Sequence, residues 1–590
     1  MSVVKKVTSQ DRCAKHAYLK LLLRLTKSGI ASLAGLIVLV GCSSPTSDDA
    51  HHSTPATSVL ARNADATKAP ELPAAKSRLR LISQDQYNNT LASIFGPDVV
   101  PDVKLTPFER TEGLLALGAA YDGFTTDSLE KFQAIATAVS SRVVSPERRD
   151  FFISCKPSDP KRADDACAVK FLGRYGERLF RRPLRSGELT EAVAKAAEGT
   201  ESTGDFYKGL SLAFERLLMS PKTLLIEDIV EADPKNRGQK RINAFSLASR
   251  LSFFLWNMAP DDVLLKAAAD GELYKPEGLA HVVDAMLASP KLEIGMRAFF
   301  DDMLGLSEFD ILAKDATIYP SFTGKVAVEA REQTLRTIVD LLLTRKGDYR
   351  DLFTTRDTFI APSIAGLYQQ PAIKSWAAYT IPQNSPRAGI VMQAGFLALH
   401  SHPGRSSATL RGKALRELLL CQPVPRPPAN VDFSVFEKPN PNLRTARERL
   451  MAHQANPVCA GCHRITDPIG LAFEHFDGAG QYRDTEKGAA IDVSGEFDGK
   501  KFKSADEFAQ VLHDSPAIPA CLVKRVYSYA TGVRLDPAQG SQIEYLNSQF
   551  AREGYRLPSL LRMIALSPAF LKVDKESDTR NASVKTATIQ

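Results

Sequence analysis

The residues most able to do chemistry lie in one pentapeptide, Cys459-Ala460-Gly461-Cys462-His463. Two thiols at this spacing can each add to a vinyl group of haem, and the His that follows is placed to ligate the iron. Cys459, Cys462 and His463 therefore predict one covalently bound haem c, with His463 as an axial metal ligand.

Other interpretations of this pentapeptide remain open at the level of sequence. A zinc site would need a fourth ligand, and no second Cys pair with zinc spacing follows. A thioredoxin-like redox pair belongs at a strand-to-helix turn of a βαβ unit, and the surrounding pattern lacks one. A disulfide closed across only two residues would be strained. Haem attachment is the favoured interpretation of the four.

The sixth ligand of such a haem is open. We expect His453, six residues before the first Cys of the motif, with Met563 as the alternative. Ordinary packing or a surface position explains either residue equally well. Two strong axial ligands favour electron transfer, whereas an open position permits chemistry on a small molecule. Arg464 and Arg483 could pair with haem propionates, although solvated surface positions are the simpler interpretation.

The N-terminus has the pattern of an export signal. Residues 1–41 combine seven Lys and Arg with one acid, and they contain an apolar run from Gly29 to Val40. The run has the length of a signal-peptide core and is short for a membrane crossing. The sequence Leu39-Val40-Gly41-Cys42 is similar to the lipobox of bacterial lipoproteins, which implies cleavage before Cys42 and lipidation of its thiol. A retained helical anchor is the alternative.

Most of the net charge lies in this leader. The chain has 590 residues and a formal charge of +7, of which residues 1–41 contribute +6. The remainder is nearly neutral and has no global basic field, so we expect no nucleic-acid partner. An apolar fraction of 44% indicates a folded protein. The chain lacks a series of long apolar segments, which excludes a multi-span membrane protein.

The eight Cys do not form one population. Cys13 leaves with the leader, and three others have the roles given above. The remaining four are Cys155, Cys167, Cys421 and Cys521. An even number in an exported protein suggests two disulfides, and sequence proximity favours Cys155–Cys167, which leaves Cys421–Cys521. Connectivity is not fixed by sequence, and four buried free thiols are the alternative.

Hydrophobic spacing of the helical kind recurs along most of the chain after Arg78. Ser83-Gln84-Asp85-Gln86 fits a capping box before an amphipathic helix that Gly96-Pro97 would end. The best hairpin candidate is Ala490–Phe502, with Asp498-Gly499 as its turn. Further helices are expected within residues 171–180, 210–218, 245–255, 263–268, 279–287 and 326–343. We predict a mainly α, multidomain helical protein with a C-terminal cytochrome-c-like haem domain and a short hairpin.

The predicted organisation follows these patterns and composition shifts. Its segments are a lipoprotein signal peptide (1–41), a flexible tether (42–76), an N-terminal helical module (77–145), a helical module with Cys155 and Cys167 (146–235), a central helical module (236–410), a cytochrome-c-like haem-binding module (411–500), a C-terminal helical module (501–572) and a disordered tail (573–590).

Several segments resemble a multidomain family of exported bacterial proteins, whose modules are named Planctomycete cytochrome C or domain of unknown function 1587, 1595, 1592, 1588 and 1585. In that order, the similar segments are RLRLISQDQYNNTLASIFG (78–96); CAVKFLGRYGERLFRRPL (167–184) and LLMSPKTLLIED (217–228); INAFSLASRLSFFLWNMAPDDVLL (242–265), followed by RAGIVMQAGFLALHS (387–401); RGKALRELLLCQPVPRPPANVDF (411–433) and HQANPVCAGCHRITDPIGLAFEHFDGAGQY (453–482); and CLVKRVYSYATGVRL (521–535) and SLLRMIALSPAF (559–570). Ser406-Ser407-Ala408 departs from the Thr-Ser-Pro that the family often shows, which affects only a local turn. The resemblance implies an exported haem protein and supplies no substrate.

From the motif and the resemblance we expect a membrane-anchored, exported c-type cytochrome with one haem, which transfers electrons to or from a partner protein. One alternative is a haem oxidoreductase that acts directly on a peroxide or polymer, and another is a binding scaffold with a structural haem. Ser43, which follows the lipidated Cys42, favours the outer membrane, with the protein on its periplasmic or cell-surface side.

Overall fold

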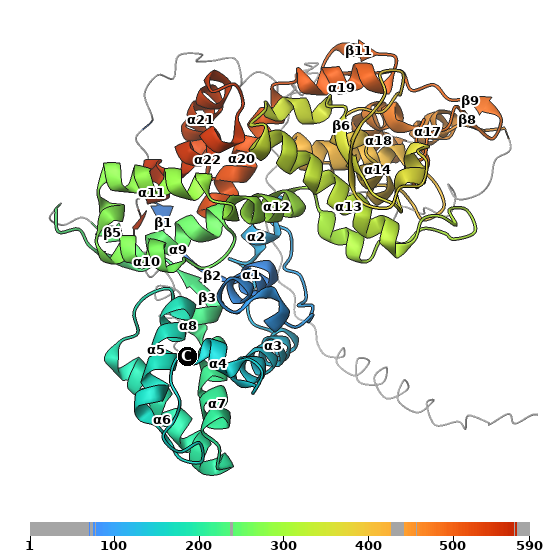
Figure 1. Ribbon diagram of the computed structural model, residues 1–590. Coiled ribbons are helices and arrows are strands. Elements are labelled where there is room, and N and C mark those ends of the chain that lie inside the picture. Colours follow the sequence, from blue (N-terminus) through green and yellow to red (C-terminus); the bar gives the residue numbers. More distant parts are fainter. Residues whose placement is uncertain are drawn as a thin grey trace, which may run out of the picture. The chain divides into compact units, whose positions relative to one another are not determined.

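A computed structural model describes residues 70, 75–76, 78–235, 240–425, 442–455, 457–571 and 573–574 of the chain (Figure 1). The predicted signal peptide, Cys42, and most of the predicted tether and tail lie outside these residues. Helices account for 58% and strands for 8% of the structure, which confirms the prediction of a mainly α protein. Within the described ranges, no helix has the length and hydropathy that a membrane crossing requires.

The first helical group begins with the predicted capping box. The Ser83 side chain accepts a hydrogen bond from the Gln86 amide, the Gln86 side chain accepts one from the Ser83 amide, and α1 ends at Gly96, whose φ is +90°. The helices of this group are α1 (Gln84–Phe95), α3 (Thr126–Val144), α5 (Asp165–Phe180), α6 (Ser186–Thr203) and α7 (Phe206–Leu218). Their apolar faces form one hydrophobic cluster, in which the ring of Phe95 contacts those of Tyr175 and Phe214.

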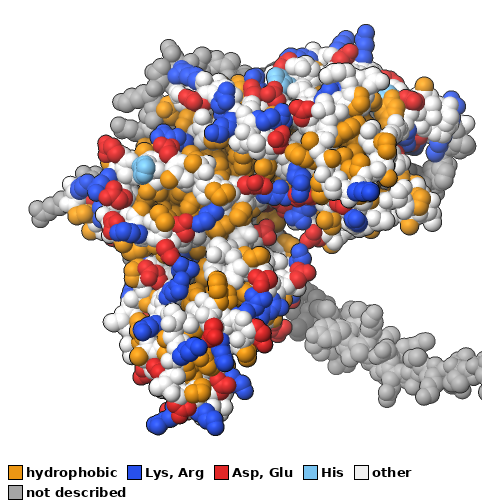
Figure 2. Space-filling view, in the orientation of Figure 1, with side chains coloured by type: hydrophobic (Ala, Val, Ile, Leu, Met, Phe, Trp, Pro, Cys, Tyr) orange, Lys and Arg blue, Asp and Glu red, His pale blue; other side chains and the backbone are white. Residues whose placement is uncertain are grey.

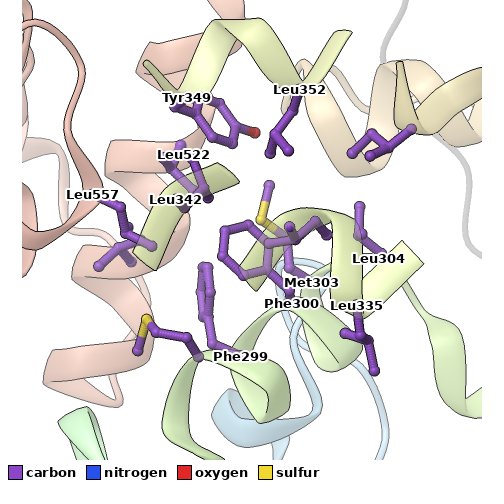
Figure 3. Close-up of a cluster of buried hydrophobic side chains, with 14 of the residues drawn as sticks. Phe299, Phe300, Met303, Leu304, Leu335, Leu342, Tyr349, Leu352, Leu522 and Leu557 are labelled. Carbon is purple, nitrogen blue, oxygen red and sulfur yellow. The ribbon is translucent and has the colours of Figure 1, made fainter. Parts of the chain in front are cut away.

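A second and larger hydrophobic cluster joins the remaining modules. Its main helices are α9 (Ala244–Leu255), α10 (Asp262–Ala269), α11 (Pro276–Ala288), α12 (Lys291–Met303), α13 (Gly324–Val339), α19 (Ala505–His513), α20 (Ala517–Thr531), α21 (Gly540–Arg552) and α22 (Leu557–Ala565). Figure 3 shows Phe299 and Met303 of α12 beside Leu522 of α20 and Leu557 of α22. Segments more than two hundred residues apart in sequence therefore share this core.

The strands are short, and within the described residues they pair two at a time. The pairs are β1 (Ala75–Lys76) with β12 (Val573–Asp574), β2 (Leu79–Leu81) with β3 (Leu225–Glu227), β4 (Val230–Ala232) with β5 (Lys240–Ile242), β6 (Asp357–Ile360) with β7 (Ala377–Thr380), β8 (Thr485–Glu486) with β9 (Ala489–Ala490), and β10 (Gly495–Phe497) with β11 (Lys500–Phe502). The last pair confirms the predicted hairpin. Asp498 and Gly499 have φ of +49° and +77° at its turn, as a type I′ turn requires.

Charged side chains of both signs share the surface. Figure 2 shows Lys and Arg beside Asp and Glu over the visible face, with hydrophobic side chains between them. This mixed surface fits the nearly neutral charge of residues 42–590.

A buried ion cluster joins Arg78, beside β2, to Asp228 and to Arg250 of α9. The Asp228 carboxylate accepts hydrogen bonds from Arg78 at 2.9 Å and from Arg250 at 2.5 and 3.2 Å, and its side chain is 5% exposed. Arg250 also donates to the Phe570 carbonyl oxygen. Burial would raise the pKa of Asp228, but the charges of Arg78 and Arg250 outweigh it and lower this pKa to about 2.

We predict that Asp228→Asn lowers the free energy of unfolding by about 3–5 kcal/mol, because two buried guanidinium groups lose their counter-charge. In the wild type, the depressed pKa stabilises the fold above the ordinary Asp range, and this stabilisation is lost as pH falls from about 4 towards 2. Urea titrations across this pH range measure both effects. Asp284→Asn is the control, because it removes an exposed pair with Arg562 whose contribution is about 0–1 kcal/mol. Equal losses in the two variants would contradict the prediction.

Candidate functional site

The Cys-x-x-Cys-His pentapeptide lies on α18 (Pro457–Gly470). Cys459 is buried and Cys462 half-buried, and both thiols are free. The other four predicted cysteines pair as expected, Cys155 with Cys167 and Cys421 with Cys521, so both disulfide predictions are confirmed. The two cysteines of the motif are thus set apart from the structural cysteines of the described chain.

A close helix crossing positions α18. It packs on α15 (Ala408–Ala414), where Gly412 meets the backbone of Thr466 and Gly470 meets the backbone of Ala408. A Cβ atom on either glycine would overlap a carbonyl oxygen of the facing helix. Only glycine allows this approach.

Arg411 of α15 also stabilises this helix crossing. Its side chain is fully buried and donates to the carbonyl oxygens of Phe473 at 2.8 Å and Phe476 at 2.7 Å, and further to those of Leu397 and Asp477. Burial lowers the pKa of Arg411 to about 10, so the guanidinium stays charged at neutral pH. It holds the loop after α18 against α15.

This crossing brings polar groups to the ring of His463. The Nδ1 atom of His463 lies 2.8 Å from Asp467 Oδ2, one turn along α18. Asp467 is itself held by Thr409 at 2.9 Å, Gln454 at 3.1 Å and Thr466 at 3.1 Å, and its side chain is 1% exposed. Nδ1 is therefore engaged by a fixed carboxylate, and Nε2 is the ring nitrogen left for another partner.

The structure brings only one of the two predicted sixth ligands to this place. The ring of His453, on α17 (Ala446–Gln454), contacts that of His463 at a tilt of 39°, with ring centroids 4.4 Å apart. Burial and then the charge of His463 lower the pKa of His453. Met563 packs against the large hydrophobic cluster on α22, which contacts α11, α20 and α21.

Metal–nitrogen bonds are about 2 Å long, so a metal ion between two imidazoles would keep their ring centroids well beyond 4.4 Å. Ligation of one ion by both His463 and His453 would therefore require the two rings to move apart. The choice between His453 and Met563 stays a prediction.

Other groups named from the sequence have different surroundings. The thiol of Cys462 donates to the Pro425 carbonyl oxygen at 3.2 Å. Arg464 is exposed, as the simpler interpretation predicts. Arg483 is held by the Glu474 carboxylate at 3.0 Å and by Ser406 at 2.9 Å. Arg483 is therefore engaged within the protein.

Sequence reasoning missed the groups that fix the site. Asp467 stands four residues after His463, a spacing that places both on one helix face and that could have been noticed. Thr409 and Arg411 come from α15, more than fifty residues earlier in the chain, and nothing in their local sequence indicates the contact. Among the described residues, no group of three or more His, Cys, Asp and Glu side chains is arranged to hold a metal ion.

Comparison with protein families assigns most of this architecture to modules of unknown function. The matching descriptions are Protein of unknown function (DUF1595) for residues 167–227, DUF1592 for 242–369, DUF1588 for 387–486 and DUF1585 for 498–570. The DUF1588 match contains α15, α18 and the pentapeptide, and begins upstream of the predicted boundary at residue 411. The resemblance of residues 78–96 to a fifth module stays a prediction. No curated protein and no solved structure matches the chain.

We predict that Gly470→Ala and Gly412→Ala each destabilise the protein by about 1–3 kcal/mol, because the added methyl forces α15 and α18 apart. Thermal unfolding followed by circular dichroism measures the change. Gly461→Ala is the matched control on α18, since a Cβ there meets nothing within 4 Å. It should be neutral or slightly stabilising. A loss at Gly461 as large as at Gly470 would contradict the importance of the crossing.

Proposed function

We propose that this chain, which carries four modules of the Planctomycete cytochrome C type, is an exported c-type cytochrome with one covalent haem. Cys459 and Cys462 would hold the haem through thioether bonds, and His463 would ligate the iron. The observation that carries the proposal is the combination of two free thiols on one helix with an adjacent His whose Nδ1 is already engaged.

The residues present fit this group. The two thiols lie three residues apart on α18 and are not bonded to each other, so both are available for vinyl addition. Haem attachment needs two thiols and one axial nitrogen and does not need a cluster of metal ligands. A bound haem would supply one-electron chemistry.

The chain's own residues have defined tasks in this proposal. Asp467 holds the proton of His463 on Nδ1 and fixes the orientation of the ring, while Thr409 and Gln454 hold Asp467 in place. A carboxylate partner also makes the imidazole a stronger donor, which favours the oxidised metal. This arrangement suits a cytochrome that gives electrons readily.

The proposal further includes a membrane anchor, a redox partner and a sixth ligand of the iron. Lipidation of Cys42 would anchor the protein to the outer membrane, and a redox partner protein would dock on the helical modules. His453, or Met563 as the alternative, would complete the iron coordination after a rearrangement. Two strong ligands support electron transfer, whereas an open sixth position would support direct action on peroxide or a polymer.

Production in a host with cytochrome-c maturation tests the haem directly. We expect one haem per chain by pyridine haemochrome assay, and His463→Ala should lose the low-spin spectrum. Thiol titration of denatured protein should find two reactive cysteines, Cys459 and Cys462, in haem-free protein and none in the loaded protein. A mature chain without covalent haem would refute the proposal. A spectrum that cyanide changes at once would favour the oxidoreductase alternative.

We predict that Asp467→Asn raises the midpoint potential of the haem by an amount on the order of 60 mV, equivalent to a tenfold change for one electron. The reason is that the neutral amide no longer strengthens the donor nitrogen of His463. A spectroelectrochemical titration gives the value. Asp484→Asn is the control, because this exposed carboxylate contacts the Tyr482 hydroxyl and not the site. An unchanged potential in Asp467→Asn would contradict the role given to this carboxylate.

A further inference from the structure

A cavity of about 560 Å³ lies between three segments that are distant in sequence. One wall is the loop at Arg110–Gly113, the second is the stretch from Glu417 to Pro423 with the disulfide-bonded Cys421, and the third is α20. Its volume falls within the range of about 300–1,000 Å³ that small-molecule sites occupy. None of the residues assigned above to haem attachment lines it.

The α20 wall is rigid and carries two donors one turn apart. Leu522 of this helix is fully buried in the large cluster shown in Figure 3. Arg525 and Ser528 line the cavity, and they are only 8% and 3% exposed. The packing of α20 against the core therefore fixes the positions of these two polar side chains.

Each of these two side chains has one buried polar atom without a hydrogen-bond partner among the described residues. Arg525 Nη2 donates to the Glu417 carbonyl oxygen at 2.8 Å, but its Nε has no hydrogen-bond partner in the described structure, and neither has the Ser528 hydroxyl. A buried donor without an acceptor costs about 1–3 kcal/mol, more when charged. Two such donors on one wall of a cavity indicate an acceptor that comes from a ligand.

Arg525 forms no ion pair among the described residues, although burial lowers its pKa and the charge of Glu112 opposes this. Arg110 is paired with Asp302 at 2.9 Å, and Glu417 is paired with Lys413. Glu112 is the second acidic group of the lining, and Lys524 adds a third cation on an exposed side chain. The three cations exceed the two acids by one. The rest of the lining is apolar, with Leu418, Pro423 and Leu535.

We propose that this cavity binds a carboxylate carried on an apolar body, with Arg525 and Ser528 as the donors. A forked guanidinium beside a hydroxyl suits the two oxygens of a carboxylate, and the apolar lining suits the body behind it. The carboxylate has two possible sources, a diffusible organic acid or a propionate of the haem. The haem source rests on the proposed function. The haem-attachment motif is linked to the cavity lining, because the Cys462 thiol contacts Pro425, two residues after Pro423 of the lining.

Calorimetric titration with 4-phenylbutanoate and its neutral amide tests the proposal. The full mature chain is used in two forms, haem-loaded and haem-free, with the haem content of each sample measured separately by pyridine haemochrome. The variants are Arg525→Gln and Ser528→Ala. Ser252→Ala is the matched control, because its hydroxyl is also buried and unpartnered but lies on α9, away from the cavity. Circular dichroism checks the fold of each, and Ser528→Ala keeps the test decisive if Arg525→Gln fails to fold.

We expect the acid to bind at least tenfold more tightly than the amide. Arg525→Gln should weaken acid binding by about 10- to 100-fold and Ser528→Ala by about 2- to 10-fold, whereas Ser252→Ala should change it less than twofold. Binding to both forms of the protein identifies a diffusible acid. Binding to the haem-free form alone, with a shifted midpoint potential in the two loaded variants, identifies the propionate.

The proposal is overturned if neither form binds the acid and neither variant shifts the potential, or if the amide binds as tightly as the acid. A sample without covalent haem that still binds the acid would refute the cytochrome and support the cavity. A haem-loaded protein that binds no acid, and whose midpoint potential is the same in the two variants, would support the cytochrome and refute the carboxylate site. The two failures are therefore distinguishable.

Discussion

The close crossing of α15 and α18 is the constraint on which the candidate site depends. Gly412 and Gly470 let the two helices approach until backbone touches backbone, and this distance puts Thr409 within hydrogen-bond reach of Asp467. Asp467 then fixes the ring of His463. A wider crossing would remove Thr409 from the carboxylate and free the imidazole, so a steric requirement at two glycines becomes an electrostatic property of the proposed axial ligand.

Buried cations on carbonyl oxygens keep the long connections of this protein in place. Arg411 donates hydrogen bonds to carbonyl oxygens of the loop after α18. Lys314 donates to the Ala398 carbonyl oxygen at 2.7 Å, near the end of α14 (Ala394–Leu399). Arg181 donates to three carbonyl oxygens of α8 (Pro221–Leu224) and the start of β3, those of Lys222, Thr223 and Leu225. In each case the cation donates to carbonyl oxygens near the end of a helix or in a turn. Arg525 differs from these residues because its Nε, at a cavity wall, has no acceptor among the residues that the structure describes.

The proposed haem and the proposed carboxylate site meet at one end of the same helix pair. The π-helical turn η8 (Leu415–Leu419) continues α15, and the Arg416 guanidinium on it donates to the Ile465 carbonyl oxygen of α18. Just beyond η8, the Cys421–Cys521 disulfide fastens this end to α20. The cavity and α18 are therefore connected through one hydrogen bond, the packing of η8 on α15 and one disulfide.

Features with local causes could be predicted from the sequence. The capping box at Ser83, the turn at Asp498-Gly499 and the helical periodicity follow from neighbouring residue types, and the structure has them as expected. Counting and proximity favoured the two disulfides over free thiols, and the structure confirms the pairing. The motif at Cys459–His463 was equally visible, and its haem is a proposal. The surroundings of that motif follow from the tertiary packing alone. Thr409, Arg411 and the cavity donors Arg525 and Ser528 act across tens to hundreds of residues, and their spacing follows from helix packing and buried polar satisfaction, which no local pattern records.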